Sequence, residues 1–348
     1  MVLAIAGVPA AVALADAAIA AEAPKPLIPQ DLEATIDHGL FYLQKLQKSD
    51  GSFETAAPPA ASAALVVLAM LASGHTPDLG KYGQTLRSAV EYLLGQGGDK
   101  GYFGAEGSKM YGHAIATLVL AQVHGTELDE NLRRRVRQSL DKALKIITTS
   151  QDAKKERDIY AGGWRYEPTS TDADLSVTGW CVAAMRGCLS VGLPVPRERF
   201  ERAAAFALRC YRADRKAFAY QPQQDPSSAM TAAGMLCLAA VESAVRGEMS
   251  SAAQFLIDNP VKESTPYMYY SVYCTTHAAS GIGEKGWTAV WKQNLALLQP
   301  LQRKEDGAWP ARGSSEPAGD NRPGRLYPTT MACLALSVPL RLAPMFRR

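Results

Sequence analysis

Residues 162–178 read GGWRYEPTSTDADLSVT, and the interpretation of the whole chain starts from this stretch. A glycine-rich turn carrying an aromatic residue, Gly162-Gly163-Trp164, precedes a short acidic segment, and an apolar helical run begins at Leu175. The same order of polar turn, aromatic residue and apolar helix recurs along the chain, so the stretch is one copy of a repeat. Only this copy carries an Asp-x-Asp pair, Asp172 and Asp174, which makes the pair the first candidate for chemistry.

Each repeat of about fifty residues pairs an amphipathic helix with a helix that is apolar on every side. In the first unit, Ile36, Leu40 and Leu43 recur at helical spacing, and residues 61–73 then form an almost uninterrupted apolar run. This pattern is typical of an outer helix packed on a buried inner one. The six inner helices are expected near residues 61–73, 114–123, 177–189, 229–241, 271–280 and 329–340.

The six helix pairs predict an all-α domain over residues 31–345, because no segment shows the period of a strand. An open stack of helix pairs needs polar caps on its terminal inner helices. The last inner helix, which includes Met331 and Leu336, has no polar face. Closure of the array solves this problem. We therefore expect an (α/α)6 toroid, with an inner ring of apolar helices inside an outer ring.

The composition excludes several classes of protein. The 348 residues carry a formal net charge of +3, so nothing in the charge balance indicates nucleic acid as a partner. The six cysteines form no Cys-x-x-Cys pair, which argues against a zinc ribbon or a thioredoxin-like motif. Most of them lie in apolar helical runs, so we expect buried free thiols.

The first 23 residues are rich in alanine and end in a small-residue pattern, Ala18-Ile19-Ala20, that is typical of a signal-peptide cleavage site. No Lys or Arg precedes the apolar run, and Pro9 and Asp16 interrupt it, so an unstructured leader is the alternative. The segment predicts a periplasmic or secreted protein, or a cytoplasmic one if it is only a leader.

The repeats carry a second signal, because a glutamine precedes the glycine-aromatic turn in four of the six units. These are Gln47…Gly51-Ser52-Phe53, Gln96…Gly101-Tyr102-Phe103, Gln151…Gly162-Gly163-Trp164 and Gln302…Gly307-Ala308-Trp309. In this respect the chain resembles the squalene–hopene cyclase and prenyltransferase repeat superfamily, as a member with a single barrel. The resemblance covers residues 31–345 and implies the toroid. It does not fix an activity, because the superfamily includes cyclases, zinc-dependent prenyltransferases and non-enzymatic binding domains.

The resemblance to class II cyclases assigns a role to the acidic pair. Those enzymes protonate an alkene or epoxide with the middle acid of Asp-x-Asp-Asp, which makes Asp174 the proton donor and Asp172 its neighbour. Leu175 stands where the third acid is expected. Neighbouring acids help to keep one of them protonated, so this departure weakens the match. The second barrel that usually encloses the substrate also has no room in this chain.

The resemblance to zinc-dependent prenyltransferases is not supported by the residues. The chain has no Asp-x-Cys pair, and Cys274 and His277 provide only two candidate ligands, one helical turn apart. We therefore expect no metal and no cofactor.

The acidic pair also has a purely structural interpretation. Asp172 and Asp174 lie at the start of an inner helix, where a carboxylate accepts backbone N–H groups and contributes about 0.5–2 kcal/mol as a cap. A capping carboxylate is expected to have a lowered pKa, the opposite of what a general acid requires. Both roles remain open, and one acid can cap while the other faces the ring interior.

The repeat predicts that the remaining candidate binding residues lie close together. Every inner helix begins at the same end of the ring, so the polar side chains at these openings should line one mouth above an apolar channel. His113 can also be a structural residue bonded to a neighbouring loop. The candidate substrate-binding residues are Tyr111, His113, Arg165, Tyr269, Tyr270 and Tyr327.

Two functions follow from these observations. The first is a terpene-cyclase-like barrel that binds an apolar, isoprenoid-like small molecule, with acid-initiated cyclase or isomerase chemistry at Asp174. The alternative is a non-catalytic exported toroid that binds a peptide, glycan or lipid through its polar mouth. Peripheral membrane association and the oligomeric state are left open.

Overall fold

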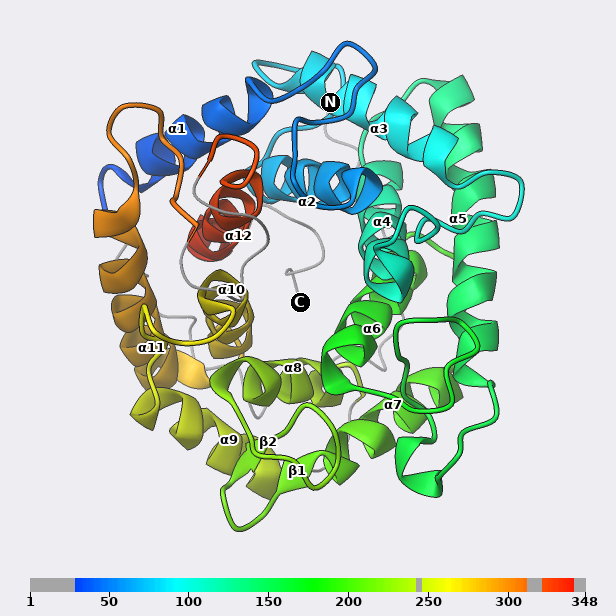
Figure 1. The fold of residues 1–348 in the computed structure, drawn as a ribbon, viewed down its shortest axis with the longest axis vertical. Helices are drawn as coiled ribbons and strands as arrows, with labels where there is room; N and C mark the ends of the chain where they lie inside the picture. The colour runs from blue at the N-terminus through cyan, green and yellow to red at the C-terminus, as the bar shows by residue number, and fades with distance from the viewer. Residues whose placement is uncertain (1–28, 242–245, 312–320, 341–348) are drawn as a thin grey trace, which may run out of the picture.

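The computed structural model describes residues 29–241, 246–311 and 321–340, and these form two concentric rings of helices (Figure 1). The predicted all-α toroid is therefore confirmed. The outer ring contains α1 (Leu32–Gln44), α3 (Gly83–Gln96), α5 (Glu130–Gln151), α7 (Arg197–Arg209), α9 (Arg246–Asp258) and α11 (Gly283–Leu298). The inner ring contains α2 (Pro59–Ala72), α4 (Lys109–His124), α6 (Leu175–Ser190), α8 (Ser228–Ala239), α10 (Met268–Ala279) and α12 (Leu326–Ser337).

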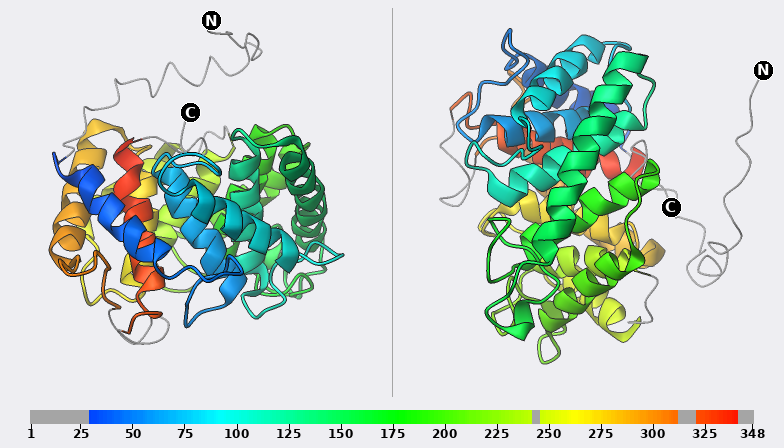
Figure 2. Two further views of the ribbon diagram at one scale, coloured as in Figure 1. Left: turned by 90° about the horizontal axis from the view of Figure 1, so that it is seen from above. Right: turned by 90° about the vertical axis from the view of Figure 1, so that its right-hand side faces the viewer.

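The inner helices run in a common direction, so their first turns meet at one end of the ring (Figure 2). The turns from the outer helices to the inner ones lie at this end, which we call the mouth. The fourth of these turns forms a short hairpin of β1 (Tyr211–Arg212) and β2 (Ala217–Phe218), which the sequence pattern did not predict. Its two-residue strands are too short to show an alternating apolar pattern.

The ring is closed by contacts between its last and first units. Helix α12 packs against both α1 and α2. The Ser73 and Ser337 hydroxyls lie 3.0 Å apart at the far ends of α2 and α12, and the Gln302 side chain donates to the Thr35 carbonyl at 2.9 Å. The apolar surface of α12 is buried by these neighbours, which is the physical reason that closure was expected.

The repeated glutamine has a defined structural role. In three units its Nε2 amide donates two hydrogen bonds, one to the glycine carbonyl of its own turn and one to a carbonyl of the next outer helix. The pairs of acceptors are Gly51 and Thr85 for Gln47, Gly162 and Arg199 for Gln151, and Gly307 and Thr35 for Gln302. Because one amide satisfies two backbone carbonyls, it joins each unit to the next.

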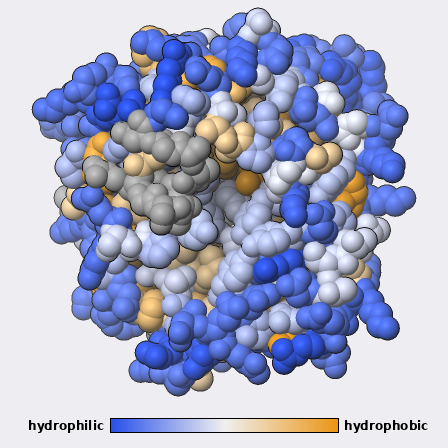
Figure 3. All heavy atoms as spheres, in the orientation of Figure 1, coloured by the Kyte–Doolittle hydropathy of each residue, from blue (hydrophilic) through white to orange (hydrophobic). Residues whose placement is uncertain are grey.

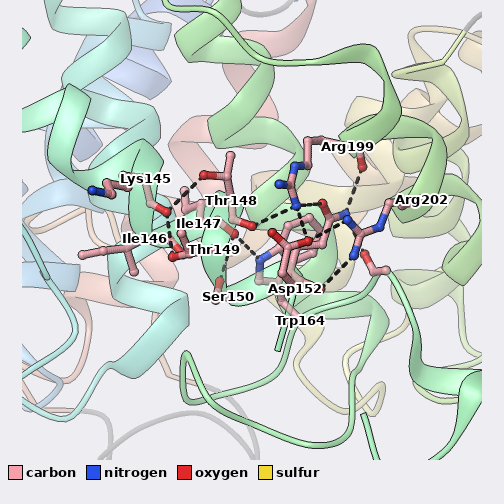
Figure 4. A network of polar contacts seen from close by, with 12 residues as sticks. Lys145, Ile146, Ile147, Thr148, Thr149, Ser150, Asp152, Trp164, Arg199 and Arg202 are labelled. Atoms are coloured by element: carbon pink, nitrogen blue, oxygen red, sulfur yellow. Dashed lines mark hydrogen bonds and ion pairs between the residues drawn. The ribbon is translucent and has the colours of Figure 1, made fainter. Parts of the chain in front are cut away.

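The third turn shows how this junction is reinforced (Figure 4). The Trp164 indole donates to the Ile147 carbonyl at 2.8 Å, which fixes the aromatic residue under the last turn of α5. Asp152 accepts from Arg199 at 2.6 Å and from Arg202 at 2.7 Å, both on the next outer helix. The aromatic residues of the other turns, Phe53, Phe103 and Trp309, are buried as completely as Trp164.

The glycine of each turn is required by the backbone. Gly307 has φ +79°, and a Cβ at this position would lie 2.4 Å from the His38 carbonyl oxygen of α1. Gly307→Ala is therefore expected to lower the free energy of unfolding by about 2 kcal/mol or more, since left-handed strain and a backbone clash add together. Chemical denaturation provides the measurement.

Gly80→Ala is the matched control for this substitution. Gly80 also has a positive φ, +68°, but a Cβ there would meet no atom within 4 Å. The control should lose only about 1 kcal/mol from backbone strain. Equal losses in the two variants would show that the approach of α1 to the turn does not constrain residue 307.

All six cysteines are free and buried, as predicted. The predicted signal segment, residues 1–23, lies outside the described residues, and so do residues 341–345 of the predicted domain. None of the described helices is both long and apolar enough to cross a membrane.

Candidate active site at the start of α6

Asp174 is held at the N-terminus of α6 by hydrogen bonds to the preceding turn and to the first residues of the helix. Its Oδ1 accepts the Val177 N–H at 2.8 Å, so the side chain caps the helix as the structural interpretation predicted. Its own N–H donates to the Trp164 carbonyl at 2.9 Å. The Thr178 hydroxyl donates to the Asp174 carbonyl at 2.6 Å and accepts the Trp164 N–H at 3.1 Å. The turn and the helix thus fix the position of this carboxyl group together.

The pKa of Asp174 is raised, and the expectation that capping would lower it is wrong. The side chain is fully buried, at 0% exposure, and burial raises its pKa from 3.8 to about 6. The Val177 N–H, the Arg165 guanidinium 3.2 Å from Oδ2 and the Tyr220 hydroxyl all act in the opposite direction. Desolvation outweighs these contacts, which leaves a carboxyl group able to carry a proton near neutral pH.

Asp172 has a different environment, although it is only two residues away. Its side chain is about one-third exposed, with Oδ2 accepting from Arg165 Nε at 3.1 Å and from Gln221 at 3.3 Å. Arg165 therefore bridges both carboxylates through separate nitrogens. One acid is buried and the other is partly exposed to solvent, although the same guanidinium contacts both.

Three tyrosines surround the Arg165–Asp174 pair. The hydroxyls of Tyr166 and Tyr220 lie 2.7 Å apart, and the Arg165 guanidinium lies 4.4 Å and 5.3 Å from the centroids of their rings. The Tyr111 ring packs 6.0 Å from that of Tyr166. Burial, reinforced by the charge of Asp174, raises the pKa of both Tyr111 and Tyr220, so both hydroxyls stay neutral. Tyr111 was predicted, whereas Tyr166 and Tyr220 were missed as site residues.

The interior next to Asp174 is lined by aromatic side chains that connect α6 with α10. The Ser176 and Tyr270 hydroxyls lie 2.9 Å apart, and Trp180 stacks on Tyr273 with ring centroids 5.5 Å apart and an interplanar angle of 7°. These two helices are separated in the ring by α8 (Figure 1). Only Tyr270 of this group was predicted.

The structure does not bring His113 into this cluster. Its Nδ1 accepts the Phe103 N–H at 3.3 Å, and its Nε2 lies 3.1 Å from the Ala143 carbonyl. Nε2 therefore carries the proton and donates. Burial lowers the pKa of His113 to about 4, so the ring is neutral. His113 therefore has the structural role that was given as the alternative. Its ring accepts the N–H of the turn's aromatic residue, Phe103, as the Thr178 hydroxyl accepts the Trp164 N–H in the third unit.

The remaining predicted residues lie at separate openings. Tyr269 is buried and donates to the Pro310 carbonyl at 2.8 Å, while Tyr327 is half-buried against the core at the start of α12. Cys274 and His277 are both buried on α10, and the His277 ring contacts the edge of Tyr273. Within the described residues no group of three His, Cys, Asp or Glu side chains is placed to hold a metal ion.

The mouth is visible from outside in the space-filling view. Figure 3 shows a face that is largely hydrophilic at its margin and hollowed near its centre, where paler and apolar residues gather. The view looks onto the end at which the inner helices begin, which is the end that carries Asp174.

The raised pKa of Asp174 predicts a pH dependence of stability. A buried acid that binds its proton more tightly in the folded state stabilises the fold below its unfolded pKa, and this contribution is lost as the pH rises through its folded pKa. Relative to Asp174→Asn, the wild type should therefore lose about 3 kcal/mol of unfolding free energy between about pH 4 and pH 8, at about 1.4 kcal/mol per pKa unit. Denaturation of both proteins across this range measures the difference. If the unfolding free energy of the wild type relative to Asp174→Asn stayed constant or rose with pH, Arg165 would be shown to keep the carboxyl group ionised.

The fold resembles that of type II terpene cyclases. A structure comparison matches the apo form of MstE, a type II terpene cyclase from Scytonema, with a TM-score of 0.58 and 15% identity over 90% of this chain and 100% of that one. An MstE variant bound to its substrate, geranylgeranyl dihydroxybenzoate, matches with a TM-score of 0.53, 15% identity and coverage of 90% and 98%. A variant bound to its product, merosterolic acid A, gives the same four values. No protein-family model and no curated protein sequence matches the chain. At this identity the likeness establishes a shared fold.

Proposed function

We propose that the protein is an acid-initiated cyclase or isomerase of a linear isoprenoid, with Asp174 as the proton donor. The observation that carries the proposal is a fully buried carboxyl group of raised pKa, enclosed by tyrosines at the mouth of an aromatic-lined ring. The fold shared with MstE supports it, because that cyclase was captured with a geranylgeranyl substrate and with its product.

The chemistry needs no co-reactant. Asp174 transfers its proton to a carbon of a terminal alkene, and the electron pair of the alkene forms the new C–H bond. The resulting carbocation is attacked by the next alkene of the same chain, which closes a ring. The last cation loses a proton to water and forms an alkene again, and water returns a proton to Asp174. Substrate and product are therefore isomers. The partly buried ring of Tyr270 is suited to stabilise the positive charge, since aromatic rings attract cations.

Arg165 and Asp172 have a positioning role in this scheme. When Asp174 is protonated, Arg165 loses one of its two anionic partners. Asp172, 3.1 Å from Arg165 Nε, then holds the guanidinium in place. Asp172 thus balances the positive charge of Arg165 in a site that lacks the third acid of the cyclase motif.

The charges at the mouth favour a neutral substrate over a diphosphate. Lys109 pairs with Glu167 at 3.0 Å and Arg325 with Asp306 at 3.6 Å, while Arg165 pairs with both site acids. These three cations are already neutralised by carboxylates, so a diphosphate would have to displace an acid to bind any of them. The stacked Trp180 and Tyr273 also limit how deep a rigid ligand can lie, because they occupy the interior between α6 and α10.

The second candidate function is a non-catalytic toroid that binds a lipid-like ligand. The Arg165–Asp174 ion pair favours it, because a bound guanidinium stabilises the ionised acid. Incubation of the purified protein with farnesyl-, geranylgeranyl- and squalene-type chains distinguishes the two functions. The cyclase forms an isomer of unchanged mass and altered chromatographic retention, whereas the binding protein retains the ligand without converting it.

A further inference from the structure

The third unit carries an extra segment, residues 152–161, between its glutamine and its glycine turn. The other three units with the glutamine motif have a much shorter connection at this place. The segment is fixed to the outer ring, because Arg209 of α7 donates to the Ile159 carbonyl at 3.0 Å and also to the Ala161 carbonyl. The unit with this extra segment is also the unit with the acidic pair, so the contacts of the segment bear on the candidate site.

Lys155 of this segment holds the loop that leads to the acids. Its Nζ donates to the Ser170 carbonyl at 2.9 Å and to the Asp172 carbonyl at 3.0 Å. The N–H of the next residue, Glu156, donates to the Thr171 carbonyl at 2.9 Å. Three consecutive carbonyls of the loop thus accept hydrogen bonds from the segment, which limits how far the backbone of the loop can move.

The environment of Lys155 is unusual for a lysine. Its side chain is half-buried, whereas that of its neighbour Lys154 is exposed. Burial lowers the pKa of Lys155, and the charge of Asp172 acts in the opposite direction. An ammonium group that loses part of its hydration costs stability unless its N–H groups find acceptors, so the two carbonyls define a specific position for it.

Asp172 links Lys155 to the guanidinium of Arg165. Its backbone carbonyl accepts from Lys155, while its carboxylate Oδ2 accepts from Arg165 Nε at 3.1 Å. From the fourth turn, the Gln221 amide donates to the same Oδ2 at 3.3 Å and to the Ala173 carbonyl at 3.0 Å. Asp172 is therefore held from two sides, which fixes where its carboxylate meets the guanidinium.

Arg165 is the neighbour of Asp174 that can respond to a change at Asp172. The other titratable groups around the buried acid include Tyr111, Cys181, Cys210 and Tyr220. Burial raises the pKa of all four, so these groups stay neutral. The guanidinium divides its contacts between Asp172 and Asp174, so a weaker contact with one strengthens its pairing with the other.

We propose that Lys155 is a positioning residue that sets the proton affinity of Asp174 through Asp172 and Arg165. Loss of its two carbonyl contacts frees the loop, Asp172 withdraws from Arg165, and the guanidinium pairs more fully with Asp174. The acid then holds its proton less tightly at neutral pH. The effect on turnover rests on the proposed function, whereas the proton affinity of Asp174 is measurable without a substrate.

The test compares the stability of each protein with that of its own Asp174→Asn version across the pH range. In Lys155→Met the midpoint of the pH-dependent difference should move to lower pH by about one unit, because Arg165 favours the ionised acid. Lys155→Arg keeps the cation and its donors and should keep the wild-type midpoint, as should Lys154→Met on the exposed neighbour. If Lys155→Met does not fold, Lys155→Gln takes its place, since that side chain is shorter and uncharged.

A double-variant cycle with Asp172→Asn tests whether Lys155 acts through Asp172. Each single variant should lower the midpoint, and the double variant should lower it no further than Asp172→Asn alone, because the two residues act in one chain of contacts. An unchanged or raised midpoint without Lys155, or shifts that add in the double variant, would overturn the proposal. If the protein converts an isoprenoid, the pH profile of kcat/KM should shift with the midpoint. A protein that only binds its ligand would still show the shift in stability, so the failure of the proposed function and the failure of this inference give different results.

Discussion

Asp174→Asn is expected to reduce isoprenoid turnover by about 1,000-fold or more. General acids contribute about 10²–10⁴-fold, and here the proton starts the reaction, so the loss should lie toward the upper part of that range. Asparagine is a good N-cap and can accept the Val177 N–H as Asp174 does, so the start of α6 should remain folded. Initial rates of product formation, followed by gas chromatography and mass spectrometry, measure the effect.

Asp172→Asn is the matched control, because it removes the other carboxylate that contacts Arg165. It should lower the rate far less than Asp174→Asn, since Asp172 positions Arg165 and is not the donor. Its pH profile should shift to lower pH, because an Arg165 released from Asp172 pairs more strongly with Asp174 and lowers the pKa of that acid. Equal losses in both variants would contradict the assignment of Asp174 as the donor.

Trp309→Ala is expected to lower the free energy of unfolding by about 3–5 kcal/mol, the usual cost of truncating a buried tryptophan. Trp309 is fully buried in the turn between α11 and α12, and its ring packs against Gly39 of α1, where an added Cβ would lie 2.9 Å from it. Its indole donates to the Leu298 carbonyl at 2.8 Å, and its N–H donates to the Thr329 hydroxyl at 3.0 Å. The substitution leaves a cavity where the ring closes, and denaturant titration measures the loss.

Trp309→Phe separates packing from hydrogen bonding. It keeps an aromatic ring in the site and removes the bond to Leu298, so it should cost clearly less than the alanine variant. A Trp309→Ala protein as stable as the wild type would show that closure between α12 and α1 does not depend on this turn.

Much of the fold could be predicted from the sequence because its determinants are local and repeated. The glutamine and the glycine-aromatic turn recur at fixed spacing, and each inner helix is apolar on every side. The closure of the ring followed from the apolar surface of the last inner helix. The short hairpin of the fourth turn was missed, because its strands are two residues long.

The site was predictable only in part, because its properties arise from packing between repeats. The position of Asp174 at an inner-helix start was visible in the sequence, whereas its raised pKa depends on burial beneath Arg165, Tyr166 and Tyr220. The three-residue spacing of Tyr270 and Tyr273 was a signal for an aromatic face on α10. Its stacking partner Trp180 comes from α6, and no spacing along one helix predicts that contact.

The central claim is that a buried acid in a single helical ring converts a linear isoprenoid into a cyclic isomer. The most direct test is to incubate wild-type protein and Asp174→Asn with a neutral geranylgeranyl-bearing compound and to analyse the extracts by gas chromatography and mass spectrometry. The claim predicts a product of unchanged mass and fewer alkenes with the wild type, and unconverted substrate with the variant. Identical extracts from the two proteins, with the substrate bound but unchanged, would contradict the claim and leave a toroid that binds lipid without catalysis.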